Sequence, residues 1–184
     1  MINAVRELGP LKQLGYVVSD LGRAIDDWAA DGVGPWTFLP HVDTEHFEYK
    51  GSGSTLDMSI GLSYVGGMQL ELIQQHCDQP SLYNDFLTRN GEGLQHLGYF
   101  PDDFEGALAS VTNAGWTIGQ QGTLGSGRFI YFGNQHHPGT TMEISELNDR
   151  RRTFFADIEA QCDAWDGKGD PRRDAPGHGR KLST

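Results

Sequence analysis

An internal repeat constrains the fold of this chain more than any other feature of its sequence. Residues 12–24 read KQLGYVVSDLGRA and residues 95–107 read QHLGYFPDDFEGA, so an LGY motif and a following aspartate recur at equivalent positions. The later runs MQLELI (68–73) and TTMEIS (140–145) also correspond. Self-similarity of this kind indicates tandem copies of one supersecondary unit. The chain of 184 residues is therefore predicted to contain two similar modules.

Each copy is predicted to contain a strand, a helix and three further strands. The LGY segments are rich in aromatic and β-branched residues, which is typical of strands. Asp20 and Asp103 follow them as candidate helix N-caps, and Gly32 and Gly115 lie where the two helices are expected to end. The remaining strands are expected at about 35–40, 55–65 and 68–75, and then at about 116–121, 127–133 and 139–146. The fold class is therefore α+β, with the order βαβββ occurring twice.

These patterns divide the chain into five segments. They are a first module (11–78), a connecting helix (79–93), a second module (94–147), a C-terminal helix (148–165) and a tail (166–184). The tail has no apolar periodicity, so we expect it to be disordered and dispensable for folding. The two modules are expected to pair through equivalent strands, either within one chain or across a homodimer.

Charge and composition exclude several classes of function. Fourteen Lys and Arg residues against 25 Asp and Glu give a net charge of −11. That balance argues against a nucleic-acid partner or an anionic membrane surface, because both need clustered basic residues. The sequence shows no long apolar run and no signal peptide, so neither a membrane span nor secretion is expected. Two widely separated cysteines do not form a disulfide framework, and a cytoplasmic location is expected.

Four polar side chains occupy repeat-equivalent positions on predicted strands. Gln13 and His96 share a place on the first strand of each module, and Glu71 and Glu143 share a place on the last. Each alternates with large apolar residues, so the four should face away from the helix-packed core, into the concave side of a curved sheet. Burying two carboxylates together is costly unless a cation neutralises them. The set therefore predicts a divalent metal site, for Zn, Ni, Co, Mn or Fe. Taken singly, each residue fits an ordinary hydrogen-bonded or solvated role better than a metal ligand, and only the set of four reverses that balance.

Three segments resemble a known family. LGYVVSDLGRAIDDW, NGEGLQHLGYFPDDFEGALASVTNAGW and GSGRFIYFGNQHHPGTTMEISEL are similar to the vicinal oxygen chelate superfamily, and most of all to its glyoxalase I and methylmalonyl-CoA epimerase branch. The resemblance covers residues 11–147. It implies paired βαβββ modules that form a curved, open, barrel-like sheet holding a metal ion.

The resemblance also implies a ligand set. The metal ligands of the family match Gln13, Glu71, His96 and Glu143, a combination that resembles some glyoxalases. Epimerases of the family resemble His, Gln, His and Glu instead, so this chain departs from them at its first two ligands. The ring-cleaving dioxygenases use two histidines and one carboxylate, and Gln13 in place of the first histidine argues against that chemistry.

Such a site predicts proton abstraction next to a carbonyl group. A metal ion acting as a Lewis acid stabilises the enediolate that forms when the α-proton leaves. The resemblance implies Glu143 as the base, because the matching glutamate of the family alternates between ligand and base. An epimerisation would need a second group across the substrate. Glu45 and Glu48 are candidates for it, although each also fits a solvated strand edge.

The sequence therefore predicts a metal-dependent isomerase, epimerase or lyase. Its substrate is expected to be a small carbonyl compound with a neighbouring oxygen, or a thioester. Two alternatives remain open: glutathione-dependent chemistry on an apolar metabolite, and a non-catalytic protein that sequesters a small molecule on the same fold. Four converging ligands favour an enzyme, because sequestration does not require them.

Overall fold

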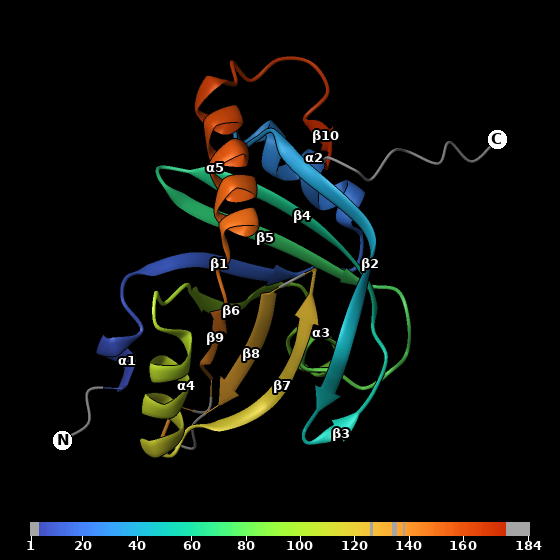
Figure 1. Ribbon diagram of the computed structural model, residues 1–184. Coiled ribbons are helices and arrows are strands. Elements are labelled where there is room, and N and C mark those ends of the chain that lie inside the picture. The colour runs from blue at the N-terminus through green and yellow to red at the C-terminus, as the bar shows by residue number, and fades with distance from the viewer. Residues whose placement is uncertain (1–3, 126, 134–135, 138, 176–184) are drawn as a thin grey trace.

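A computed structural model describes residues 4–125, 127–133, 136–137 and 139–175 (Figure 1). These residues form a mixed α+β fold around one large curved sheet, as predicted. The helices are α1 (Ala4–Glu7), α2 (Leu21–Ala30), α3 (Leu82–Asn90), α4 (Phe104–Asn113) and α5 (Asp149–Ala164). The strands are β1 (Leu11–Val17), β2 (Trp36–Tyr49), β3 (Ser52–Gly53), β4 (Asp57–Val65), β5 (Met68–Gln75), β6 (Gly93–Tyr99), β7 (Thr117–Leu124), β8 (Gly127–Gly133), β9 (Thr141–Ser145) and β10 (Arg172–Asp174).

The two repeated LGY strands lie side by side at the centre of the sheet. β1 pairs antiparallel with β6, and Leu14 lies opposite Leu97. On one side β1 pairs parallel with β5, and on the other β6 pairs parallel with β9. The strand order continues outward as β5-β4-β2 in the first half and β9-β8-β7 in the second. Equivalent strands therefore occupy equivalent places about the central pair.

Strand β2, which lies between β10 and β4, is longer than the segment 35–40 that the sequence predicts. Its first part pairs with β4, whereas Thr44, Glu45, Glu48 and Tyr49 pair with β7 of the other half. The apolar pattern of residues 36–49 is interrupted, so the pairing partner and not the pattern sets the length of this strand. The sheet therefore curves until β2 meets β7. It does not close along its whole length, because only the second part of β2 pairs with β7.

Three apolar clusters form the core. Two lie between the helices and the outer side of the sheet, and the third lies on its concave side. α2 packs Leu21 and Ile25 against Leu70 and Leu72 of β5, outside the first half. α4 packs against the equivalent face of β8 and β9, outside the second half. The third cluster fills part of the concave side, where α3 contributes Tyr83 and α5 contributes side chains including Ile158. The concave face is thus partly covered by α5, which lies across it (Figure 1).

The predicted helix boundaries are confirmed by their caps. The Asp20 carboxylate accepts a hydrogen bond from the Arg23 amide at 2.9 Å, and Asp103 accepts one from Gly106 at 3.0 Å. Gly32 and Gly115 follow the two helices with φ of +87° and +84°, a conformation that favours glycine. No described helix has both the length and the apolar character that a membrane span requires.

The prediction of a disordered tail over 166–184 is wrong for its first part; residues 176–184 lie outside the described residues. Residues 172–174 form β10, which pairs parallel with the start of β2. The Pro171 carbonyl accepts a hydrogen bond from the Trp36 amide at 2.6 Å, and Ala175 is buried. Arg172 forms an ion pair with Asp26 of α2 at 2.6 Å. Backbone pairing to a free sheet edge needs no apolar periodicity, so the sequence pattern did not reveal it.

We therefore expect the tail to contribute to stability. Removing residues 166–184 exposes the edge of β2 and breaks the Arg172 ion pair, which should lower the melting temperature by more than about 5 °C. A chain that ends after residue 175 retains β10 and serves as the control for differential scanning fluorimetry. Equal melting temperatures for the full chain and the chain ending at residue 165 would contradict a structural role of β10.

Candidate metal centre

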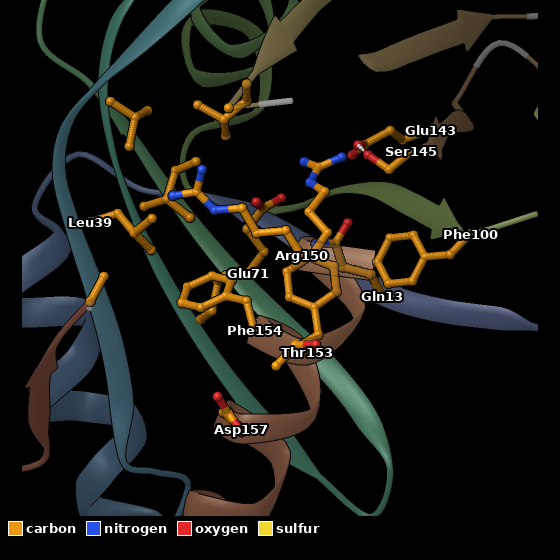
Figure 2. A pocket seen from close by; sticks show the side chains of 18 of the residues that line it. Gln13, Leu39, Glu71, Phe100, Glu143, Ser145, Arg150, Thr153, Phe154 and Asp157 are labelled. Atoms are coloured by element: carbon orange, nitrogen blue, oxygen red, sulfur yellow. Dashed lines mark hydrogen bonds between the residues drawn. The ribbon is translucent and has the colours of Figure 1, made fainter. Parts of the chain in front are cut away.

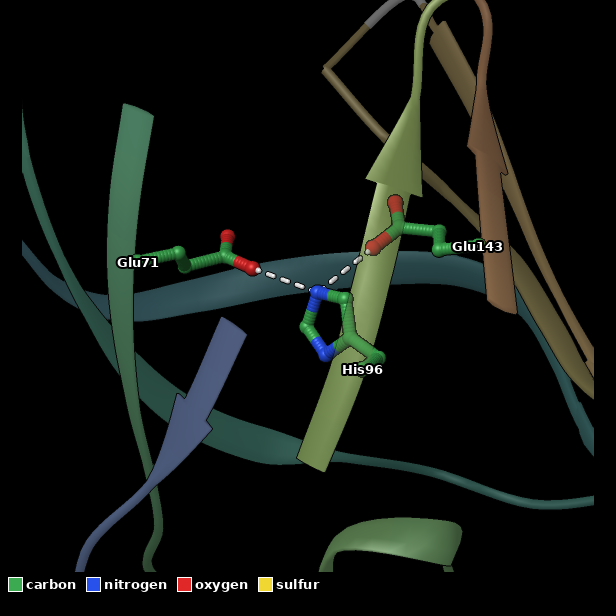
Figure 3. A group of neighbouring side chains, drawn as sticks. All are labelled: Glu71, His96 and Glu143. Carbon is green, nitrogen blue, oxygen red and sulfur yellow. Dashed lines mark ion pairs between the residues drawn. The ribbon is translucent and has the colours of Figure 1, made fainter. Parts of the chain in front are cut away.

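Glu71, His96 and Glu143 lie together on the concave face, and all three are buried (Figure 3). Their ligand atoms are all within 4.8 Å of one another. The Nε2 atom of His96 is 3.4 Å from Glu71 Oε2 and 3.0 Å from Glu143 Oε2. The fourth predicted residue, Gln13, places its Oε1 3.4 Å from the same nitrogen. The structure therefore brings together all four residues that the repeat singled out.

Strand alternation explains why these polar side chains face inward. Leu70 and Leu72 flank Glu71 and pack outward under α2. Met142 and Ile144 flank Glu143 and pack outward under α4. Because successive side chains of a strand point to opposite faces, the glutamates between them point into the concavity.

The glycines of the two LGY motifs leave room for the site. A Cβ atom on Gly15 would lie 1.8 Å from Cε1 of His96, and one on Gly98 would lie 2.5 Å from Oε1 of Gln13. Each glycine therefore accommodates a polar side chain of the neighbouring central strand. In the sequence these glycines stand out only as part of the repeat. Their role could have been predicted from the pairing of the two repeated strands, which places Gly15 opposite His96 and Gly98 opposite Gln13.

Neighbouring amides orient two of the four side chains. Nδ1 of His96 lies 2.8 Å from Gln95 Oε1, so this nitrogen donates its proton and Nε2 faces the carboxylates. The Gln13 amide group donates to Gln69 Oε1 at 2.7 Å, which leaves its carbonyl oxygen toward His96. Gln69 in turn donates to Tyr64 at 2.8 Å. These contacts hold one nitrogen and one oxygen toward the centre.

Glu143 has one satisfied and one unsatisfied oxygen. Ser145 donates a hydrogen bond to its Oε1. Its Oε2 is buried and accepts no hydrogen bond of suitable geometry from the described residues, although His96 Nε2 is near. An unsatisfied buried carboxylate oxygen is costly unless a cation or a ligand completes it.

Burial and mutual charge shift the pKa values of the three buried groups. Burial raises the pKa of Glu71, and the nearby Glu143 charge adds to this increase. Burial opposes the protonation of His96, but Glu143 and Glu71 outweigh it and raise the pKa of His96 to about 9. For Glu143, burial is outweighed by His96, Ser145 and Tyr131, and its pKa is lowered. In the absence of a metal ion, a proton on His96 therefore supplies positive charge between the carboxylates.

The donor set fits a divalent metal ion. Two carboxylates, one imidazole nitrogen and one amide oxygen converge, and the buried Glu143 Oε2 is free to bind a cation. This mixture of oxygen and nitrogen donors suits Zn²⁺, Ni²⁺, Co²⁺, Mn²⁺ or Fe²⁺. A divalent ion would also balance the two carboxylate charges, which would offset the free-energy cost of burying them together.

The centre lies on the wall of a cavity of about 650 Å³ between the concave sheet and α5 (Figure 2). Gln13, Glu71 and Glu143 line it, with apolar side chains such as Leu39 and Phe154. Of the two candidate second bases, Glu45 lines the cavity. Glu48 does not, and accepts a hydrogen bond from Gln121 at 2.7 Å. The structure thus distinguishes Glu45, which lines the cavity, from Glu48, which does not.

The fold and the centre together define a protein whose candidate metal site is carried by strands and lies on the wall of a cavity. A family model described as the glyoxalase/bleomycin resistance protein/dioxygenase superfamily matches residues 12–132. The chain belongs to this superfamily, as the sequence resemblance indicated. A search of curated proteins gives no match.

Solved structures with the same fold have low sequence identity to this chain. Methylmalonyl-CoA epimerase from Mycobacterium tuberculosis matches with a TM-score of 0.54 at 21% identity, covering 78% of this chain and 91% of the epimerase chain. A hypothetical protein from Bacillus halodurans has a TM-score of 0.54 at 15% identity, with 76% and 95% covered. A methylmalonyl-CoA epimerase in complex with methylmalonyl-CoA and NH4+ has a TM-score of 0.51 at 17% identity, with 76% and 94% covered. At these identities the likeness establishes the fold alone.

Proposed function

We propose that this protein is a divalent-metal-dependent isomerase, epimerase or lyase that removes a proton α to a carbonyl group. One observation carries the proposal: the buried cluster of Glu71, His96 and Glu143 opens onto a cavity, and within the described part of the chain Glu143 Oε2 accepts no hydrogen bond of suitable geometry. A purely structural cluster would be expected to satisfy its buried oxygens. The superfamily membership supports the same class of function.

Gln13, Glu71, His96 and Glu143 would hold the ion. When bound, the ion would supply Lewis-acid stabilisation of the negative charge that develops on a substrate carbonyl oxygen. The Gln95 contact keeps Nε2 of His96 available as a ligand, because Nδ1 carries the proton.

Glu143 is the proposed base. Its carboxylate lines the cavity, Ser145 donates to Oε1, and Oε2 faces His96 Nε2 at 3.0 Å without a hydrogen bond of suitable geometry from any described residue. Glu143 would take the α-proton and return it to another carbon in an isomerisation. In an epimerisation Glu45, which also lines the cavity, would deliver a proton from its own side. Glu48 is the weaker candidate, since it is bonded to Gln121 outside the cavity lining.

Solvent deuterium exchange tests this function without knowledge of the physiological product. We expect metal-loaded protein to incorporate deuterium α to the carbonyl of a 2-oxo-aldehyde hemithioacetal or an acyl-CoA thioester, followed by NMR or mass spectrometry. Protein treated with a chelator should lose the exchange, and re-added Zn²⁺, Ni²⁺, Co²⁺, Mn²⁺ or Fe²⁺ should restore it. Tight binding of an apolar ligand by metal-loaded protein, without exchange on any of these compounds, would instead support the sequestration alternative.

A further inference from the structure

The helix α5 contributes a wall of the cavity from outside the family match. That match ends at residue 132, whereas α5 begins at Asp149. Arg150, Arg151 and Phe154 of this helix all line the cavity (Figure 2). The helix α5 therefore lies outside the matched residues, as does β9 with Glu143.

Two consecutive arginines of α5 face the cavity without an acidic partner. Among the described residues, Arg150 has no ion pair or hydrogen bond from its side chain, and it is exposed. Arg151 is half-buried, and its Nη1 donates to the Glu146 carbonyl at 3.0 Å. Within the same part of the chain, the rest of the Arg151 guanidinium makes no hydrogen bond and no ion pair within 4 Å. The next residue, Arg152, instead pairs with Asp102 at 3.0 Å and does not line the cavity.

A backbone hydrogen bond and packing, and not an ion pair with a described residue, hold the Arg151 side chain in place. A Cβ atom on Gly127 would lie 2.7 Å from its Nη1, so this glycine leaves the space that the guanidinium occupies. The Phe155 ring lies 6.0 Å from the centre of the guanidinium. Burial lowers the pKa of Arg151, while the charges of Glu143 and Glu71 oppose that decrease. A partly buried cation with free N–H donors is costly in isolation, and a bound anion would repay that cost.

With a metal ion bound, the Arg151 guanidinium would be able to bind an anionic ligand. A divalent ion would cancel the charges of Glu71 and Glu143, and His96 would be a neutral ligand. Among the described residues, the remaining carboxylate that acts on Arg151 would be Glu146, which is already paired with Arg128. Arg151 would then present positive charge to the cavity, with Arg150 nearer the solvent. The field at the inner end of the cavity would therefore favour an anion, although the whole chain carries a net charge of −11.

We propose that Arg150 and Arg151 form an anion subsite that selects substrates bearing a carboxylate in addition to the reacting carbonyl. The inference rests on the proposed metal-dependent function and names its substrate class. A guanidinium offers a planar fork of donors that matches a carboxylate in a bidentate pair. Arg151 is less exposed than Arg150 and lines the same cavity as Glu71 and Glu143, whose charges act on it. A carboxylate bound there would therefore belong to the reacting part of the molecule and not to a distant carrier group.

Binding of malonate to Zn²⁺-loaded protein tests the subsite, with isothermal titration calorimetry as the measurement. Malonamide is the neutral probe and inorganic phosphate is the competing anion. We expect malonate to bind at least about 10-fold more tightly than malonamide, since a charge-assisted hydrogen bond contributes about 1.5–3 kcal/mol. Arg151→Gln should weaken malonate binding about 10–100-fold and Arg150→Gln less, whereas Arg151→Lys should recover part of the loss.

Arg152→Gln is the matched control, because it removes the same charge from the next position of the helix. It should leave malonate affinity unchanged, and metal analysis of each variant should show equal zinc content. An equal loss in Arg152→Gln would overturn the subsite, as would equal affinities for malonate and malonamide. Tighter binding of phosphate than of malonate, with the same dependence on Arg151, would overturn the assignment to a carboxylate.

The two proposals can fail separately. If malonate binding depends on Arg151 but no compound shows deuterium exchange, the subsite stands and the catalytic function is wrong. If exchange occurs equally on substrates with and without a carboxylate, and Arg151→Gln does not alter it, the function stands and the subsite is wrong.

Discussion

Replacing Glu143 by glutamine is expected to slow deuterium exchange by about 10²–10⁴-fold, the usual effect of losing a positioned general base. The substitution keeps the size of the side chain and one oxygen able to bind the ion, but it removes the basic carboxylate. The Ser145 hydroxyl can accept from the amide nitrogen, which leaves the amide oxygen toward the ion and keeps the side chain in place. Metal content, measured by inductively coupled plasma mass spectrometry, should therefore fall only modestly.

Glu71→Gln is the matched comparison, since Glu71 lies on the other side of His96 in the same centre. There we expect metal affinity to weaken first, with exchange partly restored by excess metal. If both variants lose metal and exchange to the same extent, Glu143 is a ligand only. The search for the base would then move to Glu45, which lines the cavity.

Replacing Gly15 by alanine should abolish tight metal binding. The new Cβ atom would overlap the His96 ring, with Cε1 at 1.8 Å, Nε2 at 2.1 Å and Nδ1 at 2.3 Å. The ring must leave its place, which removes the only nitrogen donor of the predicted set and costs stability through overpacking. Metal affinity should fall by about 100-fold or more, beyond the 10–100-fold typical of losing an outer-shell contact.

Gly53→Ala provides the control, because a Cβ atom at that strand position meets nothing within 4 Å. It should leave metal affinity and melting temperature unchanged. Gly98→Ala should give a smaller effect, since it crowds Gln13, with Oε1 at 2.5 Å and Cβ at 2.8 Å, and not the His96 ring. Normal zinc affinity in Gly15→Ala would show that His96 is not a ligand.

The repeat made the centre of the fold and the candidate site predictable. Equivalent positions of Gln13 and His96, and of Glu71 and Glu143, implied that the four residues converge once β1 and β6 pair. The alternation of these residues with leucine, methionine and isoleucine gave the face on which they lie. Both inferences need only strand periodicity and an approximate twofold relation between the halves.

The cavity wall and the sheet edges could not be predicted in the same way. The apolar face of α5 was visible in the sequence, but nothing in it indicated that Arg150 and Arg151 would meet the concave side of the sheet. The extension of β2 to Tyr49 and the pairing of β10 depend on backbone hydrogen bonds with distant segments. Such bonds leave little trace in side-chain periodicity, so they become visible only in the assembled fold.

The central β1–β6 pair gives the ion a second consequence, concerned with assembly. Gln13 and Glu71 come from one half of the chain, and His96 and Glu143 come from the other, so neither half alone holds all four candidate ligands. An ion bound by all four would cross-link the two halves at the seam between them, which is the β1–β6 pairing. Any separation of β1 from β6 would then have to release the ion, so free metal would oppose opening of the seam by mass action.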